Sequence, residues 1–328
     1  MISNLEFQQF RGLEHIEFNG LGHANLIVGG NNTGKTSILE ALVLLFGANH
    51  QLAKLPTTFR ELPANGEDHG VGYWKLLLKT GKLEDLKLLT DDQVVVGLVN
   101  QHGKHLLYGE SLGSPEKLLL EFDDAWNTAI HRPVGKSKLA ILSTKQKDPS
   151  EISELFNQIA PLNPENETRL EDLMRSAIEP RLKRLRYAKP KGSSRHLVYV
   201  DLGEGAMLPF TQLGQAFSRT LQIYCEIFAN QPDIILIDEI ENGLYYEGLG
   251  DFWKGLMAVL EDQNVQLFAT THSRECMEAA YEAAKGMKSD PLRYLRLDRR
   301  VNDPSKIVST VFGVKEMATA IEFSREMR

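Results

Sequence analysis

The sequence predicts an α/β fold with a mainly parallel core sheet, flanked by an antiparallel β lobe and a helical insertion. Three observations lead to this prediction. In the last third of the chain, apolar strands alternate with helices, which is typical of a parallel sheet with crossover connections. Near the N-terminus, an apolar run leads into a glycine-rich loop and then a helix. Between residues 48 and 114, short β-like runs separated by glycines indicate an antiparallel sheet.

The N-terminal third supplies the first strands and the first helix. Polar–apolar alternation in Ile2–Phe10 and Leu13–Phe18 predicts two antiparallel strands that lead into the core strand Ala24–Val28. The helix after the glycine-rich loop should end at Gly47, because glycine commonly terminates helices. The strands expected in the β lobe, residues 48–114, are Trp74–Leu78, Leu86–Leu89, Val94–Val99 and His105–Tyr108.

The remainder divides into an insertion and an alternating segment. In the insertion, residues 115–205, we expect helices Pro115–Ile130, Ile152–Ile159 and Glu165–Ala177, strand Lys138–Ser143 and a hairpin of Leu182–Ala188 with His196–Leu202. Beyond it we expect helix Gln212–Ala229, strand Asp233–Asp238, helix Tyr246–Asp262, strand Val265–Thr270 and helix Ser273–Lys285. Because no repeat or low-complexity linker separates these parts, we interpret residues 1–328 as one domain.

Composition excludes several classes of protein. With 42% hydrophobic and 25% charged residues, the 328-residue chain has an ordinary globular composition. It has no apolar run of the roughly 20 residues that a membrane helix needs, and no signal peptide at its start, so we expect a cytoplasmic protein without a membrane partner. Cys225 and Cys276 lack metal-ligand spacing and are expected to be buried. The net charge of −7 argues against a protein that binds nucleic acid over its whole surface.

The sequence GGNNTGKT, residues 29–36, matches the phosphate-binding pattern G-x4-G-K-[ST] and lies between a predicted strand and a predicted helix. Its glycines let backbone N–H groups turn toward phosphates, and the helix N-terminus favours an anion. Lys35 would reach the β- and γ-phosphates of ATP, and Thr36 would hold Mg²⁺. The plainer alternative is a glycine-rich turn before a helix. The candidate nucleotide-binding residues here are Gly29, Gly30, Asn31, Asn32, Thr33, Gly34, Lys35, Thr36 and Ser37.

A second element of a nucleotide site follows the apolar run IILI at residues 234–237. A Mg²⁺–nucleotide site needs a carboxylate on a neighbouring strand, and Asp238 is the candidate metal ligand. Glu239, the next residue, is the candidate base that polarises the attacking water. An apolar strand that ends in one acid is common and often has no catalytic role, so this prediction depends on the pairing with the loop at Gly29.

Four segments resemble the ABC-type P-loop ATPases of the RecF, SMC/Rad50 and overcoming-lysogenization-defect (OLD) group. They are FQQFRGLEHIEF, GGNNTGKTSILEAL, PDIILIDEIENGLYY and FATTHSRECMEAA. The chain is most similar to the stand-alone AAA15/AAA21 ATPases, which are relatives of the OLD ATPase domain. The resemblance covers nearly the whole chain, including the final AIEFSREMR, and is loose over residues 48–180. It implies an ABC-type ATPase head that binds ATP and Mg²⁺.

The resemblance also implies roles for residues outside the loop and the acids. His272 stands where the family has a switch histidine that contacts the γ-phosphate, and residues 241–244 stand where a loop crosses the dimer interface. The segment PFTQLGQAFSR, residues 209–219, is similar to the signature that caps the partner subunit's nucleotide. Thr211 stands where the family usually has Ser, and Gly214 keeps the expected glycine, whereas Ala216 replaces the second glycine and Ser218 stands where Arg or Gln is frequent. An ordinary helix N-terminus is the plainer alternative. Gln51 and Gln93 are both candidates for the metal-coordinating glutamine of the family.

One stretch, RLKRLRYAKPKGSSRH at residues 181–196, is strongly basic and has no acid. On a hairpin, alternation would place Arg184 and Arg186 on one face. Such a patch suits a nucleic-acid backbone, and a solvated sheet edge protected by charge is the alternative. The candidate nucleic-acid contacts are Arg181, Lys183, Arg184, Arg186, Lys189, Lys191 and Arg195.

Together these patterns predict a Mg²⁺-dependent ATPase. In its ATP-bound state it should form a head-to-tail homodimer, coupled to a nuclease or toxin partner or to nucleic acid. The alternative is an ATP-dependent switch that does not hydrolyse ATP, acting as the binding subunit of a nuclease or toxin complex. A GTPase is disfavoured because the nearest guanine motif, TKQK at residues 144–147, lacks its final acid. A nuclease in its own right is disfavoured because residues 273–328 are too few for a metal-binding Toprim domain.

Overall fold

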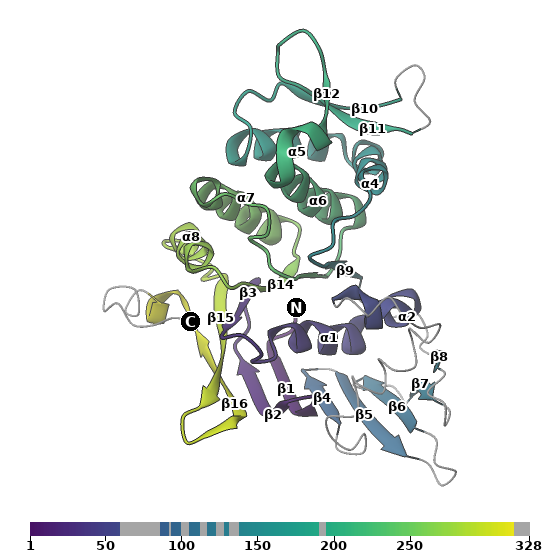
Figure 1. Cartoon of the computed structure of the whole chain (residues 1–328), viewed down its shortest axis with the longest axis vertical. Coiled ribbons are helices and arrows are strands. Elements are labelled where there is room, and N and C mark those ends of the chain that lie inside the picture. Colours follow the sequence, from purple (N-terminus) through teal and green to yellow (C-terminus); the bar gives the residue numbers. More distant parts are fainter. Residues whose placement is uncertain are drawn as a thin grey trace.

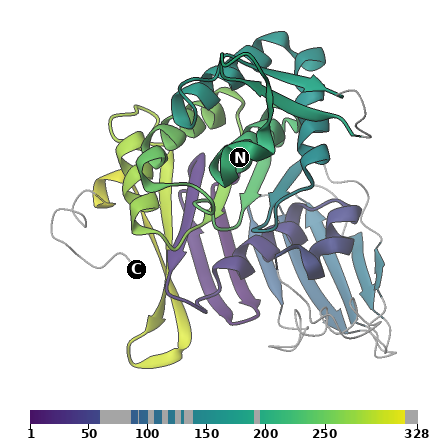
Figure 2. The same cartoon turned by 45° about the horizontal axis from the view of Figure 1, so that its top comes forward.

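The computed structural model describes residues 1–59, 86–91, 93–99, 105–111, 117–122, 128–130, 138–189 and 195–317. Its centre is a six-stranded sheet with one hydrophobic cluster on each face. Helices α4 to α8 belong to the cluster on one face, whereas α1 and a seven-stranded antiparallel sheet belong to the cluster on the other (Figures 1 and 2). The predicted α/β class with a mainly parallel core sheet is confirmed.

The core sheet has the strand order β16-β15-β3-β14-β13-β9. The bounds are β16 Asp303–Phe312, β15 Leu292–Arg300, β3 Ala24–Gly29, β14 Gln266–Thr270, β13 Ile234–Ile237 and β9 Leu139–Leu142. Every neighbouring pair is parallel except β15 with β16. The carboxyl ends of β3, β14, β13 and β9 therefore meet at one edge, which is where open α/β sheets bind ligands. Sequence analysis did not predict β15 and β16, whose charged residues obscure the strand pattern.

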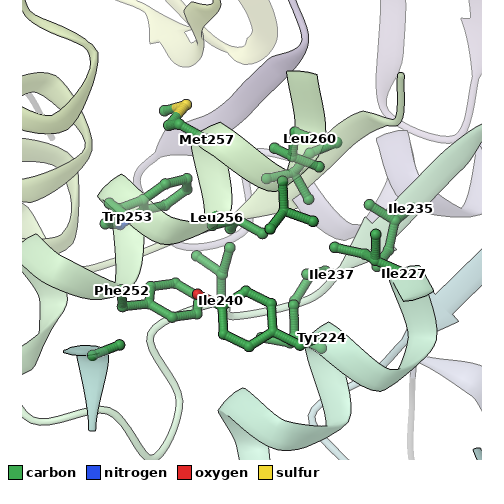
Figure 3. Packing of buried hydrophobic residues seen from close by; sticks show 14 of the residues in the cluster. Tyr224, Ile227, Ile235, Ile237, Ile240, Phe252, Trp253, Leu256, Met257 and Leu260 are labelled. Atoms are coloured by element: carbon green, nitrogen blue, oxygen red, sulfur yellow. The ribbon is translucent and has the colours of Figure 1, made fainter. Parts of the chain in front are cut away.

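Strand β13 explains how the sheet is held between its two clusters. Ile235 and Ile237 belong to the cluster with α6 (Gly214–Asn230) and α7 (Leu249–Asp262), whereas Leu236 belongs to the cluster with α1. Figure 3 shows the first of these contacts, with side chains of α6 and α7 gathered over β13. Because a strand in a parallel sheet is buried on both faces, its sequence is continuously apolar. This packing fixes the position of the residues that follow Ile237.

The antiparallel sheet has the order β2-β1-β4-β5-β6-β7-β8. Its strands are β1 Asn4–Phe10, β2 Leu13–Asn19, β4 Lys87–Thr90, β5 Gln93–Val99, β6 His105–Ser111, β7 Lys117–Phe122 and β8 Thr128–Ile130. The predicted helix Pro115–Ile130 is wrong, because β7 pairs with β6 and β8 along this stretch. Its three leucines are too short an apolar run to distinguish a helix from a strand by periodicity. The predicted strand Trp74–Leu78 lies outside the described residues.

Two helices lie between the sheets. Helix α1 (Lys35–Phe46) ends at Gly47 as predicted and is buried along nearly its whole length. Helix α2 (Asn49–Thr58) falls where we predicted the start of the β lobe. The side chain of Gln51 accepts a hydrogen bond from the Ala48 N–H at 2.8 Å, which satisfies the N–H of the N-cap residue and favours the start of a helix here.

The part of the chain above the core in Figure 1 contains the predicted hairpin. Strands β10 (Arg184–Ala188) and β11 (Leu197–Asp201) pair antiparallel, and β12 (Leu208–Pro209) adds to β11. Further helices in the described part of the chain are α4 Pro149–Leu162, α5 Pro164–Ala177, η2 Phe210–Leu213, η3 Tyr246–Gly248 and α8 Arg274–Ala284. Cys225 and Cys276 are buried and free, as expected. Within the described ranges, no helix is long and apolar enough to cross a membrane.

Candidate nucleotide site

The loop after β3 has the backbone shape of a phosphate cradle. Gly29 and Gly34 have φ values of 142° and 94°, which favour glycine. A Cβ on Gly29 would lie 2.2 Å from the Leu297 carbonyl oxygen of β15, so only glycine fits there. Asn31 and Asn32 lie exposed at the tip of the loop, and the Thr33 hydroxyl donates to the Gly30 carbonyl at 3.0 Å. Arg299 Nη2 also donates to the Asn32 carbonyl oxygen at 3.0 Å, so side chains hold the loop while Asn31 and Asn32 stay exposed.

Helix α1 presents an open N-terminus to this cradle. Its first residues have no side-chain cap and no acid in the first turn, so the N–H groups there are not satisfied by a side chain. Thr36 is half-buried and Ser37 is buried at this end of the helix. Free N–H groups and the helix dipole favour an anion at this position. The residues present therefore fit a bound phosphate.

Lys35 folds back over the loop. Its Nζ donates to the carbonyl oxygens of Gly29 and Gly30, both at 2.8 Å, and only 6% of the residue is exposed. Burial lowers the pKa of the Lys35 ammonium, while the charges of Asp238, Glu239 and Glu241 act in the opposite direction. A buried cation with only carbonyl partners is suited to exchange them for phosphate oxygens.

The two acids after β13 are organised by a single hydroxyl. Thr270, at the end of β14, donates from Oγ1 to Asp238 Oδ1 at 2.6 Å, and the same oxygen accepts the Glu239 N–H at 2.8 Å. Glu239 has a φ of 48°, a left-handed conformation that costs about 1–3 kcal/mol in a residue other than glycine. The hydroxyl therefore fixes the carboxylate of Asp238 and the strained backbone of Glu239 together.

Asp238 lies in an environment that disfavours its charge. Burial raises its pKa, and Glu239 and Glu40 raise it further, whereas the Thr270 bond and His272 lower it. Glu40 is fully buried on α1 and forms an ion pair with Arg11 at 3.2 Å. A divalent cation beside Asp238 would relieve this excess of negative charge. The described residues contain no cluster of three or more metal-binding side chains, so a Mg²⁺ ion here would need phosphate and water ligands, as Mg²⁺ commonly uses.

His272 follows β14 at the same edge of the sheet, and its residue is exposed. Its backbone N–H donates to Glu241 Oε1 at 2.8 Å. Because Glu241 belongs to the segment that leaves the sheet after Asp238, this bond ties the histidine to the acids. The structure thus brings together Lys35, Asp238, Glu239 and His272, which lie in three separate segments of the sequence.

Sequence reasoning assigned no role at this site to Thr270 or Arg219, and it placed Glu241 in a loop at the dimer interface without predicting its bond to His272. Arg219 of α6 is 2% exposed and donates to the Asp238 carbonyl oxygen at 3.2 Å. The signal for Arg219 was its position, because it lies at four-residue spacing with Ile223 and Ile227 on what is otherwise an apolar stripe of the helix. The signal for Thr270 was a hydroxyl at the end of an otherwise apolar strand.

Thr211 and Gly214, the candidate signature residues, lie in η2 and at the start of α6, on a different segment from the acids. Both are exposed, Thr211 in η2 and Gly214 at the first position of α6 with a φ of 88°. Neighbouring Gln215 packs against the segment after the acids, because a Cβ on Gly243 would lie 3.2 Å from Gln215 Cβ. Thr211 and Gly214 are therefore accessible to another molecule.

The two glutamine candidates, Gln51 and Gln93, lie in different elements of the fold. Gln51 caps α2 and its Nε2 donates to the Leu139 carbonyl oxygen at 2.6 Å, so the side chain is engaged at the other end of β9 from the acids. Gln93 begins β5 in the antiparallel sheet, where its backbone pairs with Ser111. Neither is placed by these contacts among the residues that meet at the carboxyl edge.

The basic residues of 181–196 separate into two groups. Arg181 forms ion pairs with Glu179 and Glu204, and Arg195 with Asp148. Arg184 and Arg186 are exposed on one face of β10 while Leu185 between them is buried, as the predicted alternation requires. Lys183 and Lys189 are also exposed, and Lys191 lies outside the described residues.

Comparison with known proteins places this geometry among ATPases. Residues 108–278 match the family model described as "AAA domain, putative AbiEii toxin, Type IV TA system", and residues 1–85 match the model described as "AAA ATPase domain". A Helicobacter pylori protein named ATP/GTP phosphatase is 20% identical over 324 residues, which cover 85% of this chain and 87% of that protein. An uncharacterized Methanocaldococcus jannaschii protein is 37% identical over 62 residues, 19% of this chain and 28% of that protein.

A solved structure shares the fold. The crystal structure of an SMC head bound to the C-winged helix domain of ScpA superposes with a TM-score of 0.54 at 12% sequence identity. The match covers 97% of this chain and 99% of that one. At this identity the likeness concerns the fold alone.

Proposed function

Since the chain belongs to the family described as "AAA domain, putative AbiEii toxin, Type IV TA system" and is an ABC-type P-loop ATPase of the SMC and RecF group, we propose that ATP closes two copies of it into a head-to-tail dimer and that hydrolysis reopens them. The observation that carries this proposal is the division of the candidate residues. Lys35, Asp238, Glu239 and His272 meet at one edge of the sheet, whereas Thr211 and Gly214 are exposed on another segment.

In the proposed site, each side chain has one task. Lys35 would donate to the β- and γ-phosphates in place of the Gly29 and Gly30 carbonyl oxygens, and Thr36 and Asp238 would hold Mg²⁺. When bound, Mg²⁺ supplies positive charge that neutralises the phosphate oxygens. Glu239 accepts the proton of the attacking water, and His272 contacts the γ-phosphate. The name of the Helicobacter relative, ATP/GTP phosphatase, supports hydrolysis of a nucleoside triphosphate.

The experiment compares hydrolysis and binding in Glu239→Gln, with Glu247→Gln as a control that alters an exposed acid of the same segment. We expect turnover of Glu239→Gln to fall by about 100-fold or more, because a positioned general base contributes about 10²–10⁴-fold. ATP affinity should change little, and the control should resemble the wild type. If the wild type and Glu239→Gln hydrolyse ATP equally slowly while both bind it, the chain is a non-hydrolysing switch and the catalytic proposal fails.

The partner that we propose is a separate nuclease or toxin, or a nucleic acid, and the hairpin favours nucleic acid as one candidate. On the outer face of β10, Arg184 and Arg186 are exposed, and Arg186 pairs in register with Tyr199 of β11. Cations beside an aromatic ring suit a nucleic-acid strand, because they contact phosphates while the ring stacks on a base. The sheet continues through β12 into η2, which carries Thr211, so a contact on this face would be transmitted to the proposed dimer surface.

A further inference from the structure

Arg219 is a buried charge on helix α6. It is 2% exposed, and Ile223 and Ile227, which follow it at four-residue intervals on α6, are fully buried. Burying a cation is costly unless hydrogen bonds and opposite charges compensate for the lost hydration. The contacts that the guanidinium makes therefore indicate what it is held for.

The guanidinium joins the ends of two neighbouring strands. Its Nη1 donates to the carbonyl oxygen of Ser143, directly after β9, at 2.9 Å. Its Nη2 donates to the carbonyl oxygen of Asp238, directly after β13, at 3.2 Å. Burial lowers the pKa of Arg219, and the charges of Asp238, Glu239 and Glu241 oppose this effect. The residue thus clamps the backbone of the candidate metal ligand to the adjacent strand.

Two buried polar atoms beside the acids have no hydrogen-bond partner. One is Arg219 Nε, a donor, and the other is Glu241 Oε2, an acceptor. The other carboxylate oxygen of Glu241, Oε1, accepts the His272 N–H. A buried polar atom without a partner costs about 1–3 kcal/mol. The site therefore keeps one unused donor on α6 and one unused acceptor on the segment after β13.

The exposed start of the same helix belongs to the proposed dimer surface. Gly214 lies five residues before Arg219, which is about 7.5 Å along a helix axis. Gln215 packs against Gly243, in the segment that also carries Glu241. A displacement of the start of α6 would therefore be passed on by a rigid helical segment to Arg219 and to the backbone of Asp238.

We propose that Arg219 is a positioning residue that couples contact with a second copy at the start of α6 to the arrangement of Asp238, Glu239 and His272. This inference rests on the proposed dimer. The clamp to both carbonyl oxygens is the essential feature, and the charge alone does not suffice.

The test measures ATP turnover per chain over a range of protein concentrations, together with ATP binding and dimer formation by sedimentation. For the wild type, turnover per chain should rise as dimers form. Arg219→Gln should bind ATP and dimerise as the wild type does, whereas its turnover should stay about 10-fold or more below that of the wild-type dimer and should not rise with concentration. Arg175→Gln on α5 is the matched control, since Arg175 also donates to two backbone carbonyl oxygens, those of Leu182 and Lys183. It should keep the wild-type rise.

Arg219→Lys tests the clamp if Arg219→Gln does not fold, because it keeps the buried charge but has a single nitrogen to offer. Its turnover should rise by less than half of the wild-type increase. A full rise in the Lys variant, or in a folded Gln variant, overturns the role of Arg219. A wild type that dimerises with no rise in turnover also overturns it. A wild type that forms no dimer contradicts the proposed function itself, so the two failures can be distinguished.

Discussion

Replacing Thr270 with Val tests whether one hydroxyl organises the two acids. Valine has nearly the shape of threonine, so the change removes the hydroxyl while the strand β14 stays filled. Two hydrogen bonds disappear: the bond to Asp238 Oδ1 at 2.6 Å and the bond from the Glu239 N–H at 2.8 Å. A bond to a charged group contributes about 1.5–3 kcal/mol and a neutral one about 0.5–1.5 kcal/mol. The free energy of unfolding should therefore fall by about 2–4.5 kcal/mol.

Catalysis should fall as well, because the hydroxyl orients a candidate metal ligand and holds Glu239 at its strained φ of 48°. Removal of such an outer contact typically costs about 10–100-fold in metal affinity or activity. The assays are urea unfolding of the nucleotide-free protein and ATP turnover against Mg²⁺ concentration. Thr270→Ser is the control, since it keeps the hydroxyl and loses one methyl group, at about 1 kcal/mol. Wild-type turnover in Thr270→Val, at any stability, would refute the reasoning.

Three further changes test other parts of the account. Asp238→Asn should abolish Mg²⁺-dependent turnover but raise the free energy of unfolding at neutral pH. The folded pKa of Asp238 is raised, so its ionised form opposes folding above that pKa, and the advantage of Asn should shrink as urea unfolding is repeated at lower pH. Gly29→Ala should lose ATP binding and about 1–3 kcal/mol of stability, because its Cβ would meet the Leu297 carbonyl oxygen at 2.2 Å. The control is Gly12→Ala, because Gly12 has open space around it. Equal effects of both changes would contradict the phosphate cradle. The double change Arg184→Glu with Arg186→Glu should weaken binding to single-stranded nucleic acid in a filter assay by about 10-fold or more. The control, Lys288→Glu with Lys306→Glu, makes an equal charge change at exposed sites and should not weaken binding. Equal loss in both would contradict nucleic-acid binding by the hairpin.

The parallel core could be predicted because its strands and helices are local patterns. Apolar runs such as Ile234–Ile237, followed by helices with one apolar stripe, leave few alternatives. The stretch Pro115–Ile130 was mistaken for a helix because strand identity there depends on pairing with β6, which is a long-range contact. Strands β15 and β16 were missed for a similar reason, since β15 depends on parallel pairing with the distant β3, and β16 is the edge strand, where exposed charged residues are tolerated.

The candidate site divides in the same way, into residues found by local motifs and residues defined by long-range contacts. Lys35, Asp238 and Glu239 lie in motifs with fixed spacing, so the sequence alone marks them as candidates. Thr270, Glu241 and Arg219 make contacts with residues 19 to 76 positions away in the chain, and no local pattern specifies such contacts. Arg219 was visible only as a charge within an apolar stripe, which by itself suggests no particular partner.

The most direct test of the central claim is the mass of the Glu239→Gln chain in solution, measured by size exclusion with light scattering in Mg²⁺ with ATP and again with ADP. The account predicts the mass of two chains with ATP and of one chain with ADP. Adding Gly214→Arg to this variant should keep ATP binding and leave a single chain under both conditions, because Gly214 is exposed at the proposed interface. A single chain with ATP in the Glu239→Gln protein, or a dimer that ignores the change at Gly214, would contradict the head-to-tail dimer.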